Sequence, residues 1–146
     1  MTIDGPDRRR RQPPVAAGVL MALAAAAFVV ASVIHFGADI PIGFTTVSDS
    51  FSGAATPEAV IAAVVAIGAT AVLTRRTRSR GVALGTTSFA LLGTAYGLTV
   101  TLNSTRTGDV AYHLGILTTL LIILGLLLAP GRPDARATRD DVRSSS

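Results

Sequence analysis

Apolar residues fall into four long blocks separated by shorter polar connections. The blocks cover residues 15–37, 57–74, 81–102 and 110–129, which are 23, 18, 22 and 20 residues long. A helix needs about 20 residues to cross the hydrocarbon core of a bilayer, and a spanning segment must satisfy its own backbone hydrogen bonds. The pattern therefore predicts an all-α fold, a polytopic membrane protein with a four-transmembrane-helix bundle over residues 15–130.

The composition agrees with this class. Of the 146 residues, 49% are hydrophobic and only 15% are charged, whereas a soluble domain carries about 25% charged residues. A soluble core of this size could not hide so much apolar surface. The chain has no cysteine, which excludes disulfide frameworks, iron–sulfur clusters and thiolate zinc sites. A soluble globular domain is therefore excluded.

Helix-start signals stand before two of the blocks. Pro57 suits the first turn of the second helix, where its missing N–H costs nothing, and Thr56 can cap it. Glu58 would then lie at the positive end of the helix dipole, and Asp109 would cap the fourth helix in the same way. The pattern predicts that both carboxylates stand at helix ends.

The arginines predict the orientation. All 13 basic residues are arginine, and four lie in each of the tails 1–14 and 131–146 and in the connection between the second and third helices. Only Arg106 lies in the other two connections, so the positive-inside rule places both termini in the cytoplasm, at the plasma membrane. The tails lack apolar periodicity and are predicted to be disordered. The first helix exceeds the 7–15 residues of a signal-peptide core, so we expect an uncleaved anchor.

Two kinds of partner follow from these patterns. The arginine runs have no interleaved aromatic residues, so we expect contact with lipid headgroups and no nucleic acid. The third helix carries a small-residue stripe, of the kind that lets helices approach closely. Packing within the bundle is the leading interpretation, and a homodimer or another membrane protein is the alternative. The stripe consists of Gly81, Gly85, Gly93 and Gly97.

The unusual polar residues gather toward the end of the bundle that has a single arginine, which we take as the outer face. Ionisable groups at membrane depth are costly and tend to be functional, whereas at a helix end they are inexpensive. One interpretation is a ligand-binding or proton-handling pocket, and the other is a set of ordinary interfacial residues, with Glu58 paired with Arg106. The candidate ligand-binding residues are His35, Glu58, Tyr96, Asn103, Tyr112 and His113.

Further alternatives involve the connection 38–56 and the two histidines. The connection carries Phe44 and Phe51, which suggest either a segment folded back over the outer mouth or an interfacial anchor. His35 and His113 could be axial ligands of haem b, and with Glu58 they could form a metal site if all three converge. We expect no catalytic residue, no metal and no cofactor.

Three short motifs carry a resemblance to a known family. They are Pro57–Ile61 opening the second helix, Phe89–Gly93 in the third, and Tyr112–His113 near the start of the fourth. Over residues 15–129 the chain resembles small four-helix integral membrane proteins of actinobacteria, and its layout is similar to that of DoxX-like proteins. The resemblance implies a bacterial topology and no particular activity. We therefore expect a non-enzymatic accessory or structural membrane protein, with a small transporter or ligand-binding protein as the alternative and a haem-binding redox protein as a weaker one.

Overall fold

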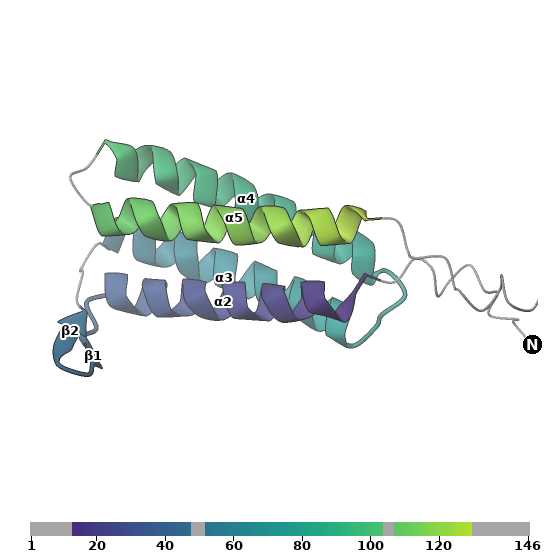
Figure 1. The fold of residues 1–146 in the computed structure, drawn as a ribbon, viewed down its shortest axis with the longest axis horizontal. Coiled ribbons are helices and arrows are strands. Elements are labelled where there is room, and N and C mark those ends of the chain that lie inside the picture. The colour runs from purple at the N-terminus through teal and green to yellow at the C-terminus, as the bar shows by residue number, and fades with distance from the viewer. Residues whose placement is uncertain (1–12, 48–51, 104–106, 130–146) are drawn as a thin grey trace, which may run out of the picture.

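The chain forms a bundle of four antiparallel helices with one small β-hairpin (Figure 1). The computed structural model describes residues 13–47, 52–103 and 107–129, so the predictions about most of both tails lie outside the described residues. The helices are α2 (Val15–His35), α3 (Ser52–Leu73), α4 (Ser79–Leu102) and α5 (Thr107–Leu128). All four are long and apolar enough to cross a membrane, which confirms the prediction of four long apolar helices.

Each helix leaves large apolar side chains on the outside of the bundle. Leu23, Ile67, Leu92 and Leu121, one from each helix, expose more than half of their surface. In water this surface would be unfavourable, because burying apolar area is the main driving force of folding. Facing lipid, it carries no such penalty, since lipid tails are as apolar as leucine.

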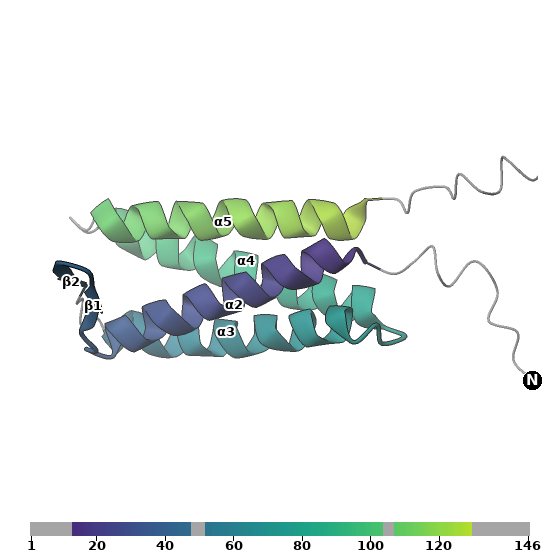
Figure 2. The ribbon, with the colours of Figure 1, turned by 60° about the horizontal axis from the view of Figure 1, so that its bottom comes forward.

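The helices pack in a ring in the order α2, α3, α4, α5. The α2–α3 pair has the most extensive contact and the α2–α5 pair the least. Figure 2 shows why: α2 runs obliquely, near α5 at its N-terminal end and over α3 at its C-terminal end. The ring of helices is therefore closed near the N-terminal end of α2, and it is open between α2 and α5 near the C-terminal end of α2.

Small residues allow close packing where the ring is closed. Gly68 of α3 faces α2 and α4 so closely that an added Cβ would collide with Thr86 and with the methyl group of Met21. Gly18 is similar, since a Cβ there would lie 2.9 Å from Val72 and Leu73. Lipid supplies no hydrophobic force between helices, so such close van der Waals contact has to hold them together.

The glycine stripe of α4 divides in two. A Cβ at Gly93 would lie 2.7 Å from Ile61, and one at Gly97 would lie 2.6 Å from the His113 ring. At Gly81 and Gly85, by contrast, no described atom would lie within 4 Å. Half of the stripe therefore packs inside the bundle, and the homodimer seam stays a prediction that concerns Gly81 and Gly85.

The connection after α2 contains a hairpin of β1 (Ile40–Ile42) and β2 (Thr45–Val47), with antiparallel pairs such as Ile40 with Val47. Its two-residue turn begins at Gly43, whose φ of +60° favours glycine, and places Phe44 fully in the open. Figure 1 shows the hairpin beyond the ends of α2 and α3. The interfacial interpretation of this segment stays open, whereas Phe51 lies outside the described residues.

Candidate functional site

The C-terminal end of α2 fixes the position of His35. The Gly37 N–H donates to Ile34 and the Ala38 N–H donates to Val33, which is the Schellman pattern, with Gly37 at a φ of +95°. This turn ends the helix at His35, whose side chain is buried. Its Nδ1 donates to Oε2 of Glu58 over 2.7 Å. A histidine and a carboxylate from two helices thus meet inside the bundle.

Glu58 lies deeper in its helix than the sequence predicted. Because α3 begins at Ser52, Pro57 is inside the helix and Glu58 is in the second turn, so the prediction of a first-turn Pro57 and a Thr56 cap was wrong. Pro57 removes one helical donor, the one that would meet the Gly53 carbonyl, and so near the helix end the loss is small. A tertiary bond holds the added turn, since the Ser32 hydroxyl donates to the Ala55 carbonyl over 2.7 Å.

The Glu58 carboxylate is only half satisfied. Its side chain is 7% exposed, and Oε2 accepts from His35, whereas Oε1 is buried with no hydrogen-bond partner among the described residues. A buried carboxylate oxygen without a partner is costly and requires an explanation. The suggested pairing of Glu58 with Arg106 lies outside the described residues.

The opposite wall of the site comes from α5. Nδ1 of His113 donates to the Asp109 carbonyl over 2.7 Å, one turn earlier in the same helix. The Nε2 side of the ring lies against Gly97 of α4, where only a residue without a side chain fits. This packing fixes the imidazole from two sides and leaves it buried.

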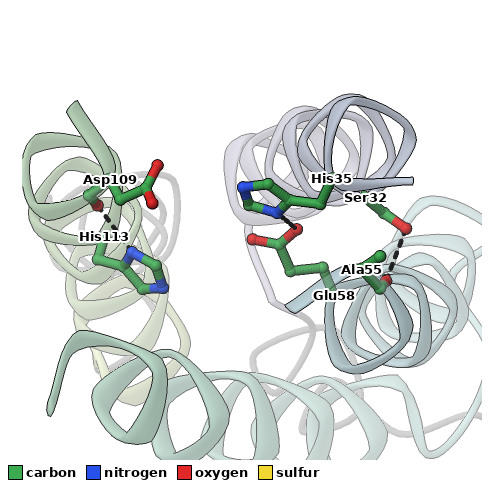
Figure 3. Close-up of polar contacts among 6 residues, drawn as sticks. All are labelled: Ser32, His35, Ala55, Glu58, Asp109 and His113. Carbon is green, nitrogen blue, oxygen red and sulfur yellow. Dashed lines mark hydrogen bonds and ion pairs between the residues drawn. The ribbon is translucent and has the colours of Figure 1, made fainter. Parts of the chain in front are cut away.

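Figure 3 shows the two polar pairs facing one another across the end of the bundle, His35 and Glu58 on one side and Asp109 and His113 on the other. Between them lies a cavity of about 240 Å³, to which all four helices contribute. The lining is partly polar and partly apolar, and Phe28, Ile61 and Val100 form apolar walls. The polar lining consists of His35, Glu58, Thr94, Tyr96, Thr101, Asp109 and His113.

The structure thus brings four of the six predicted site residues to one cavity. His35, Glu58 and His113 line it with buried side chains, and Tyr96 lines it with a largely exposed one. Asn103 is exposed, donates to the Thr99 carbonyl and does not line the cavity.

Tyr112, also predicted, lies beside the cavity and does not line it. Its ring packs edge-on against Phe28, with centroids 6.5 Å apart, and against His113 at 5.4 Å. Its hydroxyl is buried without a partner among the described residues. Tyr112 therefore supports the cavity wall from the outside.

Three polar lining residues, Thr94, Thr101 and Asp109, were absent from the predicted site. Asp109 was interpreted only as a helix cap, although it lies in the first turn of α5, one turn before His113. Thr94 and Thr101 continue the buried stripe of α4, which runs from Thr87 and Ala90 at steps of three, four and seven residues. That helical spacing is the signal by which all three could have been found.

The cavity does not resemble a metal or haem centre. Among residues 13–47, 52–103 and 107–129, no group of three or more His, Asp or Glu side chains is arranged to hold a metal ion. His35, Glu58 and His113 thus do not form the triad that a zinc site would need. His113 also turns its Nε2 toward the α4 backbone at Gly97, where a haem iron would have no room.

The predicted lid is not seen either. None of the described residues of the connection 38–47 lines the cavity, although Gly53 and Ala54 of α3, just beyond it, do.

Comparison with known proteins adds no guide to the ligand, because no family model, no curated protein and no solved structure matches this chain. The resemblance to actinobacterial and DoxX-like proteins therefore stays a prediction.

Proposed function

We propose that this chain is an integral protein of the plasma membrane that binds a small polar molecule in the cavity at its outer face. Two features support the membrane part. Large apolar side chains cover the outside of all four helices, and the sequence places twelve of the thirteen arginines beyond one end of the bundle. The termini would then be cytoplasmic, and the cavity would open on the opposite side.

The observation that carries the binding function is the half-satisfied carboxylate of Glu58. Its Oε1 borders a cavity large enough for a small molecule. A structural ion pair could be completed by protein groups alone, whereas this one leaves an acceptor directed at open space. Ionisable residues inside a membrane bundle are expensive and mark ligand or ion pathways. A ligand group that donates to Oε1 would remove the cost.

The other roles rest on less specific features. An accessory role, predicted from the sequence, needs a partner surface, and the best remaining one is the open stripe of Gly81 and Gly85. A small transporter would use the same cavity as a binding protein, and so the binding step is common to both. No catalytic step is part of the proposal.

Thiol labelling tests both parts of the proposal, because the chain has no cysteine of its own. Single substitutions would be made at Thr101, which lines the cavity, at Thr87, which is buried in α4 away from it, and at Thr77 in the arginine-rich connection. Intact cells would be treated with two membrane-impermeant methanethiosulfonates, one cationic and one anionic. Labelling would be measured by mass shift.

The proposal predicts that Thr101→Cys reacts from outside with at least one reagent. Thr87→Cys should stay unlabelled throughout, and Thr77→Cys should react only after the cells are permeabilised. External labelling of Thr77→Cys would contradict the orientation. Equal protection of Thr101→Cys and Thr87→Cys, in protein that is correctly inserted, would contradict an accessible cavity.

A further inference from the structure

We propose that the molecule bound in this cavity is a small organic cation, a protonated amine with an apolar part. This inference rests on the proposed binding function and deepens it by naming the chemistry of the ligand. Three properties of the cavity carry it: the acceptors that remain, the charge of its lining and the nature of its walls.

The Nδ1 donors of both histidines are already engaged within the protein. The His35 Nδ1–H is held by Glu58 Oε2, and the His113 Nδ1–H is held by the Asp109 carbonyl. Two lining groups are left without a partner among the described residues: Oε1 of Glu58, which can only accept as a carboxylate, and the Thr94 hydroxyl, which can accept or donate. Figure 3 shows the Glu58 carboxylate between the two polar pairs, on the side of the cavity. A ligand rich in donors fits this site, and an ammonium group offers three.

Charge favours the same choice. The described lining contains two carboxylates, Glu58 and Asp109, the imidazoles of His35 and His113, and no arginine. Charge-assisted hydrogen bonds are about twice as strong as neutral ones, and they gain further where water is scarce. The lining therefore offers carboxylate oxygens to a positive ligand and no arginine to an anion.

The walls favour an organic cation over a metal ion. The described residues provide no cluster of three or more ligating carboxylates or imidazoles, whereas hard cations need six or more oxygen ligands. Phe28, Ile61 and Val100 give the cavity apolar walls, against which a hydrocarbon group can pack. The volume of about 240 Å³ accommodates an amine of modest size.

Binding of benzylammonium to the full chain in neutral detergent tests the inference, by calorimetric titration. Benzyl alcohol is the uncharged control of similar shape, and empty micelles and sodium chloride at equal ionic strength are the blanks. The variants are Glu58→Gln and Asp109→Asn. Asp39→Asn is the matched control, because Asp39 is an exposed carboxylate outside the cavity, just after the end of α2.

We expect benzylammonium to bind at least about tenfold more tightly than benzyl alcohol, and Glu58→Gln to lose about tenfold or more, as the loss of one charge-assisted hydrogen bond implies. Asp109→Asn should lose less, and Asp39→Asn should bind as the parent chain does. Thr94→Leu, which fills the cavity and keeps the ion pair, should also abolish binding. Thr94→Leu replaces Glu58→Gln as the test variant if Glu58→Gln fails to fold.

Equal affinity for the amine and the alcohol would overturn the inference, and so would full binding by a folded Glu58→Gln chain. The outcome is separable from that of the proposed function. If Thr101→Cys labels from outside but benzylammonium does not bind, the accessible cavity stands and the cationic ligand is wrong. If Thr101→Cys is inaccessible in inserted protein, the proposed function itself fails.

Discussion

The two ends of the bundle are built from the same four helices, but they differ in how their interior is filled. At the arginine end, Met21, Val65, Leu120 and Ile123 are fully buried or nearly so, and Gly68 lets their helices approach. At the other end the interior holds a cavity with imidazoles and carboxylates. The oblique course of α2 accounts for the difference, because it approaches α5 at one end and leaves it at the other.

The comparison shows where free energy of folding is gained and where it is given up. Close packing stabilises the arginine end, since protein interiors approach the density of organic crystals. At the cavity end, an unsatisfied carboxylate oxygen and open space both reduce stability. Regions that give up stability in this way tend to be functional sites, which is consistent with the proposed binding role.

The two helix ends that carry these regions use the same turn with different residues. At the cavity end, α2 closes on Gly37 with a φ of +95°, and at the arginine end α3 closes on Arg75 with a φ of +52°. The Arg75 N–H donates to Val72 and the Arg76 N–H to Ala71, as in the Gly37 turn. A side chain in this region is strained, so glycine would suit position 75 better than arginine does.

Breaking the ion pair should have the largest effect. In His35→Leu, the buried carboxylate of Glu58 loses the partner that lies 2.7 Å away, and the expected loss of unfolding free energy is about 3 kcal/mol. The double variant His35→Leu/Glu58→Leu should be more stable than the single one, because it leaves no buried charge. Unfolding in mixed micelles, followed by circular dichroism, measures both. If the loss in the double variant equalled the sum of the losses in His35→Leu and Glu58→Leu, the two residues would not be a coupled pair.

Adding a side chain at Gly68, where the helices of the arginine end pack closely, should have the next largest effect. Gly68→Val forces a side chain against Thr86 and Met21, and overpacking of this kind costs about 2 kcal/mol. Gly85→Val is the control, since no described atom lies within 4 Å of the added Cβ, and its effect should be within about 0.5 kcal/mol. A larger loss in Gly85→Val, together with a fall in molecular mass, would instead reveal a homodimer seam.

Exchanging the residues of the two turns should have a smaller effect of opposite sign at each end. Arg75→Gly relieves a left-handed conformation and should stabilise the chain by about 1 kcal/mol, whereas Gly37→Ala should destabilise it by about the same amount. Both are read from the same unfolding titration. Changes of the same sign in the two variants would show that the turns are not equivalent.

Most of the fold could be predicted from the sequence because membrane-length apolar runs leave helix as the only workable state. Residues 81–102 and 110–129 differ from the observed α4 and α5 by no more than three residues at either end. The start of α3 could not be predicted in the same way. Thr56–Pro57–Glu58 has the local pattern of a helix start, but packing of Ala55 against Ser32 extends the helix to Ser52, and that contact joins residues 23 positions apart.

The candidate site was predicted at the right end of the bundle but with an incomplete lining. The arginine distribution separates the two ends, and His35, Glu58 and His113 all fall at the end with a single arginine. Which of these residues meet depends on the tilt of α2 and on the room beside Gly97, and neither is encoded in a short motif. Asp109 stands in the local pattern of a helix start, and that role alone accounts for an acidic residue there. Its place in the cavity could therefore not be predicted from the pattern.

The most direct test of the account is protection of the cavity by its ligand. Thr101→Cys would be labelled from outside with the cationic methanethiosulfonate, with and without benzylammonium, and Gly108→Cys, at an exposed position outside the cavity, would be labelled in parallel. The account predicts that benzylammonium slows labelling at Thr101→Cys at least severalfold and leaves Gly108→Cys unchanged. Equal rates at Thr101→Cys with and without benzylammonium, at concentrations that saturate calorimetric binding, would contradict it.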